Sequence, residues 1–194
     1  MKALSLQDAL LLPNFAAIDP AGLAATLDEK LSHNQSVIEQ LLTNQSGISY
    51  DQLVPTLEQL DDEINQLWGP LSHLHGVSNN DAVRAAFDEC LPKLTAYATQ
   101  MGQNKALYLA FLGLLESHEY SQLSQAQKQF VQLQIRDFKL AGVALNPQQQ
   151  TQYGQLKQQM AQLSTRFSNQ LMDATEHWSK HITDSKDLLG LPES

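Results

Sequence analysis

The stretch HEYSQ at residues 118–122 places a histidine next to a glutamate, a pair found in zinc proteases. In the motif HExxH, two histidines four residues apart reach one Zn²⁺ from the same helix face, and the glutamate acts as general base. Here His118 and Glu119 are present, but Gln122 stands where the second histidine belongs, and a neutral amide is a poor zinc ligand. The following SQAQ at 124–127 resembles a capping box. We therefore interpret HEYSQ as a loop between two helices and assign no catalytic residue to it.

Two other groups of residues could bind a metal. Asp173, His177 and His181 follow at steps of four, so one long helix would place a carboxylate and two imidazoles on one face. The alternative is a solvated edge on which Asp173 supports His177. SHLH at 72–75 could chelate a metal from a loop, but it follows Gly69-Pro70, so a helix-end turn is the alternative. Because no further ligand is evident, we assign no metal or cofactor residue to this chain.

The overall composition excludes several classes of function. The net charge is −9, with 12 basic and 21 acidic residues dispersed along the chain, which disfavours nucleic acid and anionic membranes as partners. The N-terminal apolar run is interrupted by Asp8 and is too short for a signal peptide, which favours a cytoplasmic protein. Cys90, the single cysteine, is expected to be a buried inert thiol on an apolar helix face.

The sequence predicts that the residues discussed above lie on or between helices. The sequence has 33 Leu against 6 Val and 6 Ile, and unbranched side chains favour helices over strands. Capping and breaking residues predict an all-α, multi-helix bundle without significant sheet, as one helical domain over 1–194. The expected helices run from Pro20 to NQSG at 44–47, from Ser49 or Pro55 to Gly69-Pro70, from Asn79 to Gly102, from Asn104 to about Leu115, from Ser124 to Gly142, and over about 147–181.

The last predicted helix carries a continuous apolar stripe. Asn146 caps it, Pro147 takes its first position, and a helix over 147–181 would be about 50 Å long. The stripe comprises Tyr153, Leu156, Met160, Leu163, Phe167, Leu171, Ala174 and Trp178, with glutamines mostly on the other face. We expect the preceding helices to cover most of the stripe but not its end near Leu171 and Trp178. Weak self-association would follow, unless Leu188, Leu189 and Leu191 fold back over that end.

Several distinctive stretches resemble one known family. They are LLPNFAAIDP at 11–20, LSHLHGV at 71–77, LPKLTAYATQMG at 91–102, IRDFKLAG at 135–142, FSNQLMDAT at 167–175 and DLLGLPES at 187–194. The order and spacing of these stretches resemble the N-terminal helical region of the thimet-oligopeptidase family of zinc metallopeptidases, in its oligopeptidase A branch. The resemblance covers essentially the whole chain.

The resemblance implies a role within a larger enzyme. Members of the family are helical, are cytosolic in bacteria, and cleave short peptides inside a deep channel with a zinc site built on HExxH. That motif follows the region that corresponds to residues 1–194, so no catalytic or zinc-binding residue is carried over. We expect this chain to be the channel-wall part of a longer peptidase, with the catalytic remainder as its partner, and to be inactive alone. The alternative is a free-standing helical interaction module derived from the family.

Overall fold

The structure, a computed structural model, describes residues 13, 15, 18–43 and 47–190. This part of the chain is 82% helical. It contains seven α-helices and the short 3₁₀-helix η3 (Ser185–Leu188), and no strand occurs among its residues. The all-α prediction is therefore confirmed. The predictions for residues 44–46 of NQSG, for Leu191 and for most of the first seventeen residues lie outside the described residues.

Three long helices begin at the caps that the sequence indicates. The Asp19 side chain accepts a hydrogen bond from the Ala21 N–H at 3.1 Å and caps α1 (Pro20–Leu42). Ser49 forms a capping box at the start of α2 (Tyr50–Val77), and Asn80 caps α3 (Asp81–Gly102). Each of these side chains satisfies a backbone N–H that the first helical turn leaves without a partner. The start of α2 is thus at Ser49 and not at Pro55.

The prediction that the second helix ends at Gly69-Pro70 is wrong, because α2 continues to Val77. A proline inside a helix removes one backbone hydrogen bond and costs about 3 kcal/mol. The turns beyond Pro70 offset this cost by burying Leu71 and His75 against the rest of the bundle. Tertiary packing therefore overrides the local breaking signal.

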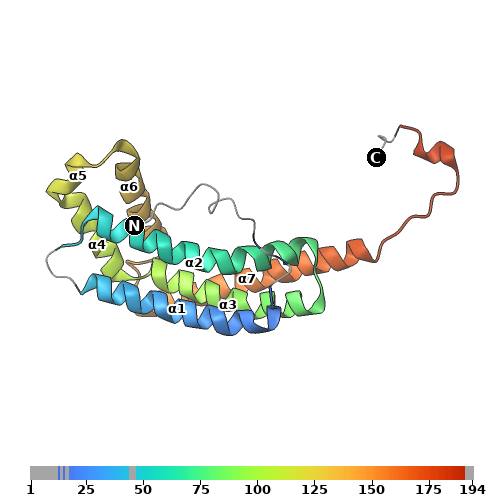
Figure 1. The fold of residues 1–194 in the computed structure, drawn as a ribbon, viewed down its shortest axis with the longest axis horizontal. Coiled ribbons are helices and arrows are strands. Elements are labelled where there is room, and N and C mark those ends of the chain that lie inside the picture. Colours follow the sequence, from blue (N-terminus) through green and yellow to red (C-terminus); the bar gives the residue numbers. More distant parts are fainter. Residues whose placement is uncertain (1–12, 14, 16–17, 44–46, 191–194) are drawn as a thin grey trace.

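The next three helices are shorter. Asn104 caps α4 (Lys105–Glu116), α5 (His118–Gln122) is a single turn, and Ser124 forms a capping box at the start of α6 (Gln125–Leu140). Gly142 follows the end of α6 and has a φ of +88°, a conformation that glycine adopts without strain. Figure 1 shows α1, α2, α3 and α7 lying lengthwise beside one another, with α4, α5 and α6 at one end.

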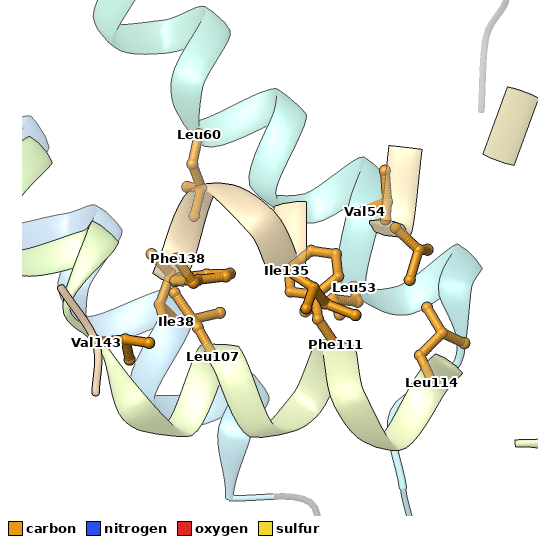
Figure 2. Close-up of a cluster of buried hydrophobic side chains, with 11 residues drawn as sticks. Ile38, Leu53, Val54, Leu60, Leu107, Phe111, Leu114, Ile135, Phe138 and Val143 are labelled. Atoms are coloured by element: carbon orange, nitrogen blue, oxygen red, sulfur yellow. The ribbon is translucent and has the colours of Figure 1, made fainter. Parts of the chain in front are cut away.

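The buried side chains form two clusters. The first joins α2, α4 and α6 to the end of α1, and Figure 2 shows its members converging between these helices. The second joins the first part of α1 to α2 and α3, around Leu27 and Leu71. Asn34 is fully buried, and its Nδ2 donates to the Leu60 carbonyl at 2.9 Å, which links α1 to α2 by a polar contact.

The last long helix, α7 (Pro147–Glu176), packs against α3. Asn146 caps it as predicted, and its 30 residues give a length of about 45 Å. The predicted end at residue 181 is wrong, because His177 already caps the helix. The Asp173 carbonyl accepts two hydrogen bonds from His177, from its backbone N–H at 3.1 Å and from its Nδ1 at 2.6 Å. The segment that follows extends away from the bundle (Figure 1).

Candidate functional site

The stretch HEYSQ is a helical turn and not the predicted loop. Ser117 caps α5, and the Gln122 side-chain amide donates to His118 Nδ1 at 3.3 Å. Glu119 points elsewhere, since its Oε1 accepts the Tyr50 backbone N–H at 3.1 Å. A carboxylate at a helix N-terminus is favoured both by the free N–H groups and by the helix dipole. Glu119 therefore stabilises the start of α2.

The two histidines of SHLH lie in α2 and cannot readily bind the same metal ion. Residues two apart on an α-helix are about 160° apart around its axis. His75 is buried, and its ring stacks on Phe87 with the centroids 3.9 Å apart. His73 is exposed, and its ring lies 5.2 Å from that of Phe15. The second histidine is therefore part of the core, and the predicted helix-end turn is replaced by continuous helix.

The structure separates the three residues that a longer helix would have aligned. Asp173 lies in α7, His177 caps it, and His181 lies beyond its end. Both carboxylate oxygens of Asp173 accept hydrogen bonds from Arg84 in α3, at 2.7 and 3.2 Å. These bonds lower the pKa of the Asp173 carboxyl below its ordinary value. Within the described residues, no group of three or more His, Cys, Asp or Glu side chains is placed to hold a metal ion.

Cys90 lies buried in α3, as predicted. Burial raises the pKa of its thiol, because the charged thiolate is disfavoured away from water. A higher pKa leaves less of the nucleophilic thiolate at neutral pH. The position and the pKa of this cysteine are those of a structural residue.

A hollow of about 500 Å³ lies where the two core clusters meet, between α2, α3, α4 and α6. Its walls are mostly apolar and its rim carries a few polar groups; the residues include Leu60, Ile64, Trp68, Tyr97, Asp61 and Asp137. Burial raises the pKa of the Tyr97 hydroxyl, so this side chain is neutral at physiological pH. The hollow is a gap in packing between the two core clusters, and polar groups lie at its rim.

The face of α7 that contacts α3 is mostly polar or small, which the periodicity of the sequence does not indicate. We call this the inner face and define it by six half-buried residues: Gln150, Gly154, Gln158, Ala161, Thr165 and Asn169. Tyr153, Met172 and Asp173 of α7 are also half-buried. The Gln158 side chain donates to the Pro92 carbonyl of α3 at 2.8 Å. The Gln150 side chain donates to the Gly142 carbonyl at 3.4 Å. These contacts and the Arg84–Asp173 ion pair set the rotation of α7 about its axis.

The apolar stripe of α7 consequently faces solvent. We call Leu156, Met160, Leu163, Phe167 and Leu171 the outer face, and each of these side chains is more than half exposed. The expectation that the preceding helices cover most of the stripe is therefore wrong. At 100° per residue, the outer face lies about 150° around the helix from the inner face, so one neighbour cannot contact both. In the described part of the chain, no helix has the length and apolar character needed to span a membrane.

Comparison with known proteins defines the class to which this helical chain belongs. Residues 23–150 match the family described as neurolysin/thimet oligopeptidase, N-terminal domain. The match covers well over half of the chain, so the chain belongs to this family. The resemblance seen in the sequence is thereby confirmed.

Several individual relatives of this chain are named oligopeptidase A. The chain is 37% identical to oligopeptidase A of Haemophilus influenzae over 183 residues, and 33% identical to that of Escherichia coli over 183 residues. It is 32% identical over 182 residues to the probable cytosolic oligopeptidase A of Arabidopsis thaliana. Each alignment covers 94% of this chain but only 26 or 27% of the relative. The chain thus spans about a quarter of the length of these relatives.

Proposed function

We propose that this chain is the N-terminal helical region of a zinc-dependent oligopeptidase that hydrolyses short peptides. The observation that carries the proposal is the alignment itself, which matches nearly all of this chain to about a quarter of each oligopeptidase A. The match to a family described as an N-terminal domain supports assigning that quarter to the beginning of the enzyme. The cytoplasm is the proposed location.

The chemistry is proposed to lie in the remainder of the enzyme. The sequence contains no HExxH, and the helical turn HEYSQ uses Glu119 to cap α2. A zinc peptidase needs at least two side chains that bind the zinc, such as the histidines of HExxH, and an activated water. The 194 residues alone are therefore proposed to be inactive. Their role is to form one wall of the channel that admits short peptides and excludes folded proteins.

A hybrid enzyme tests this proposal. The 194 residues replace the matched segment of the Haemophilus influenzae oligopeptidase A, and turnover of a quenched fluorescent peptide is measured with Zn²⁺ present. We expect turnover by the hybrid, and none by the isolated chain or by the Haemophilus enzyme without its matched segment. A folded hybrid that is inactive, beside an active parent, would contradict the proposal. The alternative of a free-standing module predicts a stop codon directly after the codon for residue 194 in the gene.

A further inference from the structure

We propose that the outer face of α7 is the surface on which the catalytic remainder of the same polypeptide docks. The inference rests on the proposed function, because it requires that the chain be part of a longer peptidase. The inference adds the surface through which this chain and the catalytic remainder contact each other. An apolar segment of that remainder covers the outer face, and we call this contact the seam.

The α7 helix is held with its apolar side outward. An amphipathic helix normally buries its apolar stripe and leaves polar residues in water. Here the Gln158 bond to the Pro92 carbonyl and the Arg84–Asp173 ion pair attach the opposite side to α3. A Cβ at Gly154 would lie 3.6 Å from the Thr99 methyl group, an ordinary van der Waals distance, so α7 lies close to α3 here as well. The polar side of α7 is thus attached to α3 at two points, which leaves the outer face for another partner.

The exposed apolar surface of α7 is extensive. The outer face runs over the 16 residues 156–171, or about 24 Å of helix. Leu156 at its start is 53% exposed, and Phe167 in its second half is 68% exposed. Five such side chains in one row make an apolar strip of a few hundred Å², a size that commonly marks an interaction site on a soluble protein.

The size of the outer face favours a partner within the same polypeptide. A stable complex between separate chains usually buries about 800 Å² on each side, more than a single helix row supplies. A partner in the same polypeptide needs less, because the covalent connection gives an effective concentration in the mM range. About three quarters of each relative lies outside the matched part and supplies such a partner. The segment beyond α7 is also apolar in places, with Trp178 and Leu189 strongly exposed, so the face continues along the chain.

Thiol labelling in the hybrid enzyme tests the seam directly. Phe167→Cys places a thiol in the outer face, and Leu140→Cys on α6 is the matched control, since Leu140 is 69% exposed. Cys90 is buried and reports unfolding by fast labelling. In the isolated chain both new thiols should react at similar rates. In the hybrid, labelling of Phe167→Cys should slow about tenfold or more, while Leu140→Cys is unchanged.

The outcomes separate this inference from the proposed function. Fast labelling of Phe167→Cys in an active hybrid overturns the seam and leaves the proposed function intact. An inactive hybrid in which Cys90 stays protected contradicts the proposed function, and the labelling ratio still decides whether the face is covered.

Two measurements on the isolated chain apply even if the hybrid does not fold. The double variant Leu163→Ser/Phe167→Ser should shift the thermal midpoint by less than about 2 °C, because the outer face lies outside the core of this region. A drop of about 10 °C would overturn the inference. Ultracentrifugation at about 1 µM should show a monomer, with weak association only at much higher concentration. A dimer at about 1 µM that Phe167→Ser abolishes would assign the face to a second copy and overturn the inference.

Discussion

Arg84 and Asp173 join α3 to the last turns of α7 through two parallel hydrogen bonds, Nη2 to Oδ1 at 2.7 Å and Nη1 to Oδ2 at 3.2 Å. The two residues are 89 positions apart in the sequence. A two-pronged arginine–carboxylate pair fixes orientation as well as distance. The pair therefore helps to keep the polar side of α7 against α3, and with it the apolar side in solvent.

Removing this pair should loosen the end of α7. Asp173→Asn deletes the charge while keeping the shape of the side chain, so amide exchange of residues 169–176 should become faster than in the unmodified chain. Exchange near Gly154 should change little, because Gln150 and Gln158 still attach that part. Glu176→Gln, an exposed change in the same turn, serves as the control. Equal exchange in the two variants would show that the pair does not hold the helix end.

The same pair predicts a defined pH dependence. The pKa of the Asp173 carboxyl is lowered in the folded chain, so folding favours its ionised form. The stabilisation is fully present above the unfolded pKa of about 3.9 and is lost as the pH falls through the lower folded pKa. The difference in unfolding free energy between the unmodified chain and Asp173→Asn should be constant above about pH 5 and shrink as the pH falls below about 4. A difference that grows on acidification would contradict this linkage.

The continuation of α2 beyond Pro70 can be tested by one buried side chain. Leu71 is 1% exposed, so Leu71→Ala should reduce the unfolding free energy by about 2–5 kcal/mol. Val77→Ala near the end of the same helix removes an exposed side chain and should cost less than about 0.5 kcal/mol. Denaturant titration measures both values. If the two variants are equally stable, the turns beyond Pro70 do not pack as the structure shows.

Of the two neighbouring residues His118 and Glu119, only Glu119 should contribute to the stability of the fold. Glu119→Ala leaves the half-buried Tyr50 N–H without its acceptor and should cost about 1 kcal/mol of unfolding free energy. His118→Ala changes an exposed side chain and should alter stability by less than about 0.5 kcal/mol. Chemical denaturation of the two variants checks this. A larger loss for His118→Ala would speak against the capping role of Glu119.

The helix beginnings could be predicted from the sequence because they depend on a few adjacent residues. Asp19, Asn80, Asn104, Ser124 and Asn146 each cap the helix that follows, as local side-chain chemistry requires. The helix ends were harder to predict. Gly69-Pro70 does not break α2, because Leu71 and His75 beyond it are buried against other helices, α1 and α3.

The direction of the apolar stripe could not be predicted from its periodicity. The pattern from Leu156 to Leu171 correctly indicated an amphipathic helix, but periodicity does not reveal which partner covers the apolar face. That choice depends on Arg84 and Pro92 in α3, which bind the polar side. The early end of α7 likewise takes His181 out of the line that a longer helix would make with Asp173 and His177.

The most direct test of the central claim is peptide turnover by the isolated 194-residue chain, measured with its zinc content. We expect no hydrolysis of a quenched fluorescent peptide and no stoichiometric Zn²⁺ after dialysis, because the sequence holds no HExxH. One tightly bound zinc with metal-dependent turnover would contradict this expectation. In that case His177→Ala and His181→Ala would be the first variants to examine.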